Sequence, residues 1–260
     1  MDLDARWAFA QSLAAEAGAL ALEWFERRDE LTVEFKGPQD RVSAADRAVE
    51  TLVRERVAKA FPSDGVFGEE QGGVATDALW VVDPIDGTTN FLRGLPHYCV
   101  AIAFVHAGRC ELGIINAPTS RETFAARAGH GATMNGKRIK VSSQSRIEEA
   151  LLGWGSSRKN PIAQDLAALG SLIAAGAEYR RLGSAAINLC QVACGRLDSF
   201  YEARLASWDA LAGLLIVREA GGVTNDFLAD DGLTKGNLVL AACRPEIYDA
   251  IFAATSKRAP

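Results

Sequence analysis

Hydrophobic and polar positions follow two different periods along the chain. In the N-terminal part, apolar residues recur every three or four positions, which is typical of amphipathic helices, and this predicts helices over about residues 3–27 and 45–61. Short apolar runs bounded by turn residues come next, and such runs are typical of strands. The predicted strands cover residues 79–82, 98–106, 111–116 and 121–126, with hairpin turns at Gly108 and at Asn135–Gly136.

The pattern changes after residue 147. A polar segment, Ser142–Ser145, is followed by alternating strands and helices rather than by further hairpins. The expected elements are a strand at 150–152, a helix at 162–175, a strand at 178–182 and two further helical runs. We therefore predict a mixed α/β (α+β) fold with two lobes, residues 1–147 and residues 148–260.

The composition is that of an ordinary globular protein and argues against several classes. Of the 260 residues, 48% are hydrophobic and 23% charged, so the chain can bury a sizeable core. The net charge of −5 and the lack of a basic stripe argue against a nucleic-acid partner. No apolar run approaches the ~18 residues that span a bilayer, and the N-terminus does not resemble a signal peptide. We therefore expect a cytoplasmic protein that needs no membrane.

The cysteines and histidines give weak signals. The five cysteines are an odd number in mostly apolar surroundings without a CxxC pair, so we expect reduced core residues. Cys190 and Cys194 are one helical turn apart, which suits a buried helix face better than a metal site that lacks a nearby His. His97 follows a Gly-Leu-Pro turn and leaves two interpretations open, contact with a substrate or a packing role.

One seven-residue segment, 83–89, places two carboxylates, a proline and hydroxyls directly after an apolar strand. Asp83 is expected at the carboxyl end of that strand, and Pro84 to fix the backbone so that the Ile85 carbonyl points inward. Two aspartates and a carbonyl without Cys or His favour Mg²⁺ over Zn²⁺. The Gly-Thr pair that follows can bring N–H groups and a hydroxyl to an anion. The alternative is an ordinary turn that caps a helix.

Two further acidic patches favour the metal interpretation. Gly68–Glu70 follows a short apolar run, and Asp209 stands near the start of an apolar helical run. Capping and the helix dipole explain Asp209 well enough when it is considered alone. Carboxylates crowd together, however, only where a cation offsets their repulsion.

Taken together, these motifs resemble the inositol monophosphatase family of Mg²⁺-dependent, lithium-sensitive phosphatases. The resemblance spans roughly the whole chain, and the combination is more specific than any single motif. It implies a layered α-β-α-β-α sandwich of the sugar-phosphatase type, a metal site between the lobes and a homodimer. The matching segments are Lys36 with Asp40–Asp46, Gly68–Glu70, Asp83–Thr88, Gly183–Ala186 with Val192–Asp198, and Trp208–Gly213.

The resemblance also implies roles for individual residues, around two to three Mg²⁺ ions per site. The metal ligands would be Glu69, Asp83, the Ile85 carbonyl, Asp86 and Asp209, with Asp83 shared by two ions. The catalytic residues would be Asp46, Glu70 and Thr88, with Thr88 hydrogen-bonded towards Asp46 and orienting the nucleophilic water. The substrate would meet Asp86, Gly87, Thr88, Gly183, Ser184, Ala185, Glu202 and Asp209.

The expected reaction is hydrolysis of a small phosphorylated polyol, above all myo-inositol monophosphate. Because no Cys or His stands at the matched positions, we expect direct attack by an activated water rather than a phosphoenzyme. Histidinol phosphate, fructose bisphosphate and phosphoadenosine nucleotides are alternative substrates. Arg204, where the family commonly has Gly, would lie near the pocket mouth, in a subunit contact or in an outward salt bridge. An alternative of another class is a regulatory binding protein that keeps the fold and contacts RNA polymerase or RNA.

Overall fold

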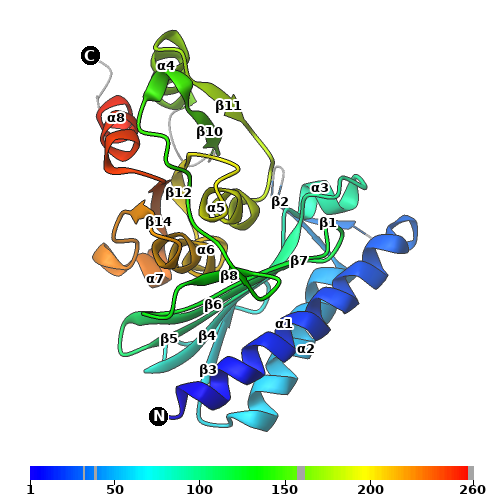
Figure 1. Cartoon of the computed structure of the whole chain (residues 1–260). Helices are drawn as coiled ribbons and strands as arrows, with labels where there is room; N and C mark the ends of the chain where they lie inside the picture. Colours follow the sequence, from blue (N-terminus) through cyan, green and yellow to red (C-terminus); the bar gives the residue numbers. More distant parts are fainter. Residues whose placement is uncertain (32, 38–39, 157–161, 257–260) are drawn as a thin grey trace.

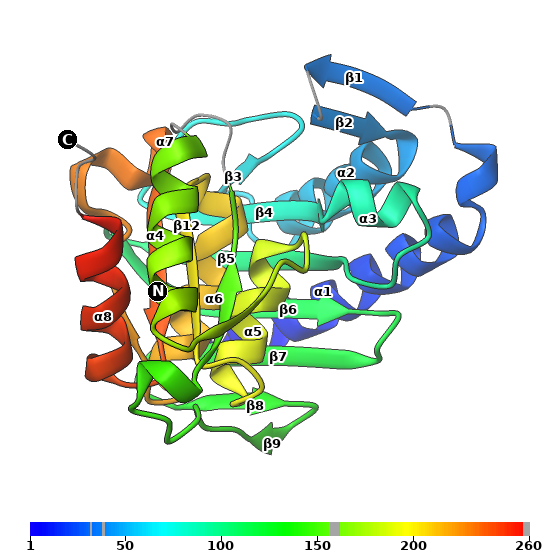
Figure 2. The same cartoon turned by 90° about the horizontal axis from the view of Figure 1, so that it is seen from above.

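The computed structural model describes residues 1–31, 33–37, 40–156 and 162–256, without the side chains of 33–37 and 40–42. The side chains of Lys36 and Asp40, which the family resemblance singled out, therefore lie outside the described residues. Two large sheets and the helices around them form five layers (Figures 1 and 2). The predicted layered α-β-α-β-α sandwich is confirmed.

The first layer is a pair of long helices, α1 (Leu3–Glu26) and α2 (Ala44–Ala60). They pack against each other and cover one face of the first sheet (Figure 1). Both begin where the hydrophobic period predicts, because polar residues cap them: Asp2 accepts from the Ala5 N–H at 2.9 Å, and Ser43 forms a capping box with Asp46.

The first large sheet has the strand order β3-β4-β5-β6-β7-β8-β9 in the described part of the chain. Its hairpins turn at Gly108 and at Asn135–Gly136, where positive φ angles suit Gly and Asn. Only the pairing of β3 with β4 is parallel among these described strands. The strands are β3 (Gly65–Gly68), β4 (Ala78–Asp86), β5 (Cys99–His106), β6 (Arg109–Ala117), β7 (Glu122–Arg127), β8 (Ala132–Met134) and β9 (Lys137–Arg138).

Strand β4 is longer than the sequence predicts. The prediction ended it before Pro84, but the strand continues to Asp86, so Asp83 lies inside β4 and not at its end. The pairing with β5 shifts register between Asp83 and Asp86. Such an irregularity accommodates a proline, which cannot donate a ladder hydrogen bond.

The second large sheet has the order β11-β10-β12-β14-β13. Helices α5 (Ala185–Ala193) and α6 (Ser207–Glu219) lie between the two sheets, while α4 (Ile162–Ala174) and α8 (Pro245–Thr255) lie on the outside (Figure 1). Its strands are β10 (Leu151–Trp154), β11 (Glu178–Arg180), β12 (Ser199–Leu205), β13 (Val223–Thr224) and β14 (Asn237–Ala242). The remaining elements are the hairpin β1 (Val33–Gly37) and β2 (Asp40–Ser43), α3 (Thr88–Leu92), α7 (Gly232–Lys235) and 3₁₀ turns at Arg28–Glu30, Ile147–Glu149 and Ala229–Asp231.

One hydrophobic core runs between the two sheets and includes residues of both halves of the chain, such as Leu79, Leu211 and Leu240. Helix α6 lies very close to the first sheet at Gly113 of β6. A Cβ added to this glycine would lie only 2.6 Å from the Ala212 carbonyl oxygen. A shared core means that the two predicted lobes pack as one body, and the boundary at residue 147 stays a prediction. Among the described helices, none combines the length and the apolar character that crossing a bilayer demands.

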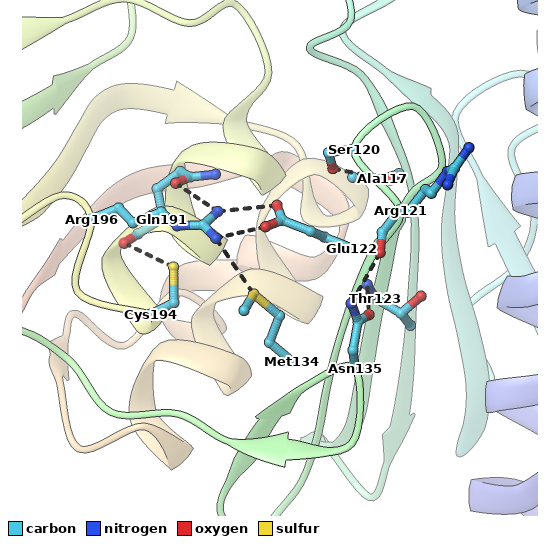
Figure 3. A network of polar contacts seen from close by, with 10 residues as sticks. All are labelled: Ala117, Ser120, Arg121, Glu122, Thr123, Met134, Asn135, Gln191, Cys194 and Arg196. Carbon is cyan, nitrogen blue, oxygen red and sulfur yellow. Dashed lines mark hydrogen bonds and ion pairs between the residues drawn. The ribbon is translucent and has the colours of Figure 1, made fainter.

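Polar contacts also join the halves at the surface. The Arg196 guanidinium, just after α5, donates to both carboxylate oxygens of Glu122 on β7, at 2.6 and 3.1 Å (Figure 3). It also reaches the Gln191 side-chain oxygen at 3.5 Å and the Met134 sulfur at 3.8 Å. At 46% side-chain exposure for the arginine, this pair fixes geometry more than it adds stability.

Candidate active site

Three aspartates converge at the junction of the first sheet with the helices between the sheets. Asp83 and Asp86 come from β4, and Asp209 from the first turn of α6. Each offers a carboxylate oxygen within 4.8 Å of the other two. Asp83 is 1% exposed and Asp86 is 7% exposed, so these charges are largely removed from water.

Glu69, just beyond β3, adjoins this cluster. Burial raises the pKa of Glu69 and of Asp83 well above the usual range, and the neighbouring carboxylates raise both further. Burial also raises the pKa of Asp86, although hydrogen bonds from Ser184 and from backbone N–H groups oppose the shift. Crowded carboxylates with raised pKa values, in a site built of oxygen donors, fit a hard divalent cation such as Mg²⁺.

A second group of contacts links Asp46 to the turn after β4. Asp46 is fully buried, and its Oδ2 accepts from the backbone N–H and the hydroxyl of Ser43, at 2.8 and 2.7 Å. Its Oδ1 lies 3.4 Å from the Thr88 hydroxyl, which also lies 3.1 Å from the Ile85 carbonyl oxygen. Burial raises the pKa of Asp46. The Thr88 hydroxyl therefore stands between a carboxylate and the carbonyl of the signature turn.

Gly87 makes this turn possible. Its φ of 99° suits glycine, and a Cβ there would lie 2.8 Å from the His97 carbonyl oxygen. That carbonyl also accepts from the Asn90 side chain at 2.8 Å. His97 is exposed and lines a different cavity, so the structure decides between neither of its two interpretations.

The N-terminus of α5 docks onto Asp86. The Ser184 hydroxyl donates to Asp86 Oδ2 at 2.5 Å, and the backbone N–H groups of Ala185 and Ala186 donate to the same carboxylate at 3.2 and 2.6 Å. The family resemblance implies that Gly183, Ser184 and Ala185 meet the substrate, and N–H groups at a helix start can bind an anion. They are instead occupied by a protein carboxylate, because Asp86 supplies the negative charge that a helix N-terminus favours.

A cavity of about 190 Å³ opens beside the cluster. Its lining includes six of the residues predicted to meet the substrate: Asp86, Gly183, Ser184, Ala185, Glu202 and Asp209. Burial, with the charges of Asp209 and Asp86, raises the pKa of Glu202 to about 8, and the charge of Arg181 opposes this shift. The cavity wall thus presents carboxylates and polar groups beside the three clustered aspartates.

Sequence reasoning missed several residues that line this cavity, among them Trp154 and Arg181. The Arg181 signal was present, because a basic residue stands two positions before the Gly183 motif. Arg204, which was expected near the pocket mouth, in a subunit contact or in an outward salt bridge, does not line this cavity. Its guanidinium donates to the Lys235 carbonyl at 2.6 Å on the exposed surface.

The layered sandwich with an acidic cluster between its two sheets defines a protein of the sugar-phosphatase type. The model of the inositol monophosphatase family matches residues 2–259, and the chain belongs to this family. The family is Mg²⁺-dependent, and the three clustered aspartates could hold such an ion.

Similar proteins carry two kinds of name. Nus factor SuhB of Pseudomonas aeruginosa is 40% identical over 236 residues, covering 87% of each chain. Nus factor SuhB of Escherichia coli K12 is 37% identical and covers 92% of this chain and 91% of its own. Among solved structures, an IMPase of Thermotoga maritima superposes with a TM-score of 0.86 at 33% identity over 96% of each chain. Extragenic suppressor protein suhB of Bartonella henselae superposes with a TM-score of 0.90 at 35% identity, over 96% of this chain and 98% of that one.

Proposed function

We propose that this protein is a Mg²⁺-dependent phosphatase that hydrolyses a small phosphate monoester, with myo-inositol monophosphate as the first candidate. The observation that carries the proposal is the convergence of three aspartates, Asp83 and Asp86 buried and Asp209 half-buried, within 4.8 Å beside a polar cavity. Two to three ions would be held by Glu69, Asp83, the Ile85 carbonyl, Asp86 and Asp209. Bound Mg²⁺ would neutralise phosphate charge, lower the pKa of a water and stabilise the leaving alkoxide.

The protein's own groups orient the reaction. A hydroxyl has one proton, and Thr88 can donate it either to Asp46 Oδ1 or to the Ile85 carbonyl oxygen. The lone pairs of its oxygen stay free to accept a hydrogen bond from the attacking water and would hold that water in line with the phosphorus. Glu70, on the neighbouring loop, is proposed as the base that takes the proton that this water gives up.

Substrate selection belongs to the cavity. Glu202 and Trp154 line the cavity, and Glu202 would accept hydrogen bonds from polyol hydroxyls. Arg181, an exposed cation on the same lining, would favour an ester with a second anionic group. The cavity therefore supports a polyol phosphate and leaves a bisphosphate as the main alternative.

Phosphate release tests the proposal. The panel is inositol 1-phosphate, glycerol 2-phosphate, histidinol phosphate, fructose bisphosphate and phosphoadenosine phosphate, each with Mg²⁺ and with chelator. Mg²⁺-dependent release with a preference for the inositol ester is expected, and lithium should inhibit it at high Mg²⁺. Preference for another ester would reassign the substrate, whereas no phosphate release from any ester would refute the proposal that the protein is a phosphatase.

A carboxamide variant ties turnover to the cluster. Asp86→Asn should lower turnover by about 10³-fold or more, because it removes a charged ligand, while circular dichroism stays unchanged. Asp249→Asn, on the exposed face of α8, is the matched control and should retain wild-type turnover. Substantial turnover in a folded Asp86→Asn protein would argue against the cluster as the site.

A second candidate function, as a Nus factor, is favoured by the names of relatives that cover most of this chain. It is tested by introducing wild type and Asp86→Asn into Pseudomonas aeruginosa that lacks its Nus factor SuhB. Rescue by both proteins would support a role that needs no turnover, and rescue by neither would argue against it.

A homodimer, which the family resemblance implies, is proposed as well, and sedimentation velocity checks it.

A further inference from the structure

Glu50 and Arg54 lie one helical turn apart on α2, behind the loop that carries Glu69 and Glu70. The Glu50 side chain is 0% exposed. Its Oε2 accepts from the backbone N–H of Glu70 at 2.7 Å, and its Oε1 accepts from that of Gln71 at 3.1 Å. One buried carboxylate thus anchors two consecutive backbone groups of the loop.

Arg54 completes the anchor. Its Nε donates to Glu50 Oε1 at 2.9 Å, which offsets the buried negative charge. The rest of the guanidinium donates to the carbonyl oxygens of Gly72 and of Val66, the latter at 3.4 Å. Because Val66 precedes the loop and Gly72 ends it, a single side chain ties both of its ends to α2.

The loop is also closed on itself and lies against Glu50. Gly68 and Gly72 exchange backbone hydrogen bonds of 3.0 and 3.1 Å, which closes the turn around the acidic pair. A Cβ on Gly68 would lie 2.5 Å from the Glu50 carboxyl group. The backbone at Gly68 therefore passes in contact with Glu50, directly before Glu69 and Glu70.

We propose that Glu50 and Arg54 are a positioning pair that holds the acidic loop against the cation site and thereby sets the affinity for the divalent cation without touching it. The proposal rests on the proposed function, because the loop supplies Glu69 as a ligand. Like charges on Glu69, Glu70 and the aspartates repel one another before a cation binds. An unanchored loop would relieve this repulsion by moving away, and the cation would then have to draw it back.

The test compares Arg54→Met with Arg56→Met in the full chain. Arg56 lies on the same helix and also pairs with a glutamate, Glu16, but both side chains are 43% exposed and face away from the loop. Calorimetric titration with Mg²⁺ or Mn²⁺ should show an affinity about 10-fold or more lower in Arg54→Met, the range known for partners that orient ligands. Hydrogen exchange at the amides of Glu70 and Gln71 should accelerate in Arg54→Met only.

Other outcomes are informative. Wild-type affinity in Arg54→Met, or an equal loss in Arg56→Met, would overturn the proposal, as would faster exchange spread over the whole molecule. If Arg54→Met does not fold, Arg54→Lys keeps the charge beside Glu50 without reaching both carbonyls, and an affinity equal to that of the wild type would again refute the pair. If wild type binds no divalent cation, the proposed function fails, and local exchange at Glu70 still reports whether the anchor exists.

Discussion

Asp83 is a buried carboxylate among other carboxylates. Without a cation, its charged form therefore destabilises the folded protein relative to a neutral group at the same position. Burial, Glu69, Asp86 and Asp209 all raise its pKa. A carboxylate with a raised pKa contributes stability below its unfolded pKa and loses that contribution as the pH rises through the folded value. Without metal, this part of the protein should therefore weaken towards neutral and alkaline pH.

Asp83→Asn should raise the stability of the metal-free protein. Asparagine keeps an oxygen to accept the Ile85 N–H, which lies 2.9 Å from Asp83 Oδ1, and it removes the buried charge. In chelator at about pH 8, the melting temperature should rise by about 2–4 °C per kcal/mol gained, and the gain should shrink at about pH 5. Differential scanning calorimetry checks both values. Added Mg²⁺ should stabilise wild type but not the variant, and the reverse result would contradict the cation site.

Helix α5 shows how one element can serve both the fold and the site. Its first turn is held by Ser184, whose hydroxyl caps the Ile187 N–H at 3.2 Å and donates to Asp86. The serine thus links the order of the helix to the position of a proposed ligand.

Ser184→Ala should therefore affect stability and turnover together. Losing the cap costs about 1 kcal/mol, which corresponds to a fall in melting temperature of about 2–4 °C. A raised KM and half-saturating Mg²⁺ concentration should accompany it, because Asp86 loses its shortest hydrogen bond. Ser171→Ala, on α4 far from the site, is the matched control and should change neither constant. An unchanged half-saturating Mg²⁺ concentration in Ser184→Ala would show that the helix cap does not affect cation binding at Asp86.

Periodicity predicted most elements, because long helices and buried strands carry regular patterns. It ended β4 too early, since Pro84 indicates a break unless the partner strand is irregular at that position. It also missed the hairpin β1–β2, although Val33 and Phe35 alternate with polar residues. The acidic motifs brought out the proposed ligands, whereas the anchor at Glu50 depends on contacts across 20 residues that no local pattern contains.

At the scale of the whole molecule, α6 is the element on which both sheets depend. Its close approach to β6 requires Gly113, and on its other side a Cβ on Gly213 would lie 2.5 Å from Leu189. Helix α6 also carries Asp209. The packing of α6 against β6 and Leu189 thus determines the position of the Asp209 carboxylate.

Gly113→Ala should destabilise the protein and weaken cation binding. The added methyl group would press on the α6 backbone, and overpacking of this kind costs about 1–3 kcal/mol. Gly170→Ala, in α4 with open space around the new methyl group, should instead stabilise by up to about 1 kcal/mol. Urea denaturation and Mg²⁺ titration of both variants check this pair. A Gly113→Ala protein with wild-type cation affinity would show that α6 can shift without moving Asp209.

The contact between Asp86 and Ser184 joins residues 98 positions apart, and Asp209 lies still later in the chain. On the ribosome, Glu69 and β4 therefore emerge before α6, and the cluster of three aspartates is complete only when α6 has been synthesised. Because a bound ion stabilises only the species that binds it, Mg²⁺ would favour the finished chain over a nascent chain whose ligand set still lacks Asp209. A premature stop before residue 209 would thus yield a product that the ion stabilises less than the full chain.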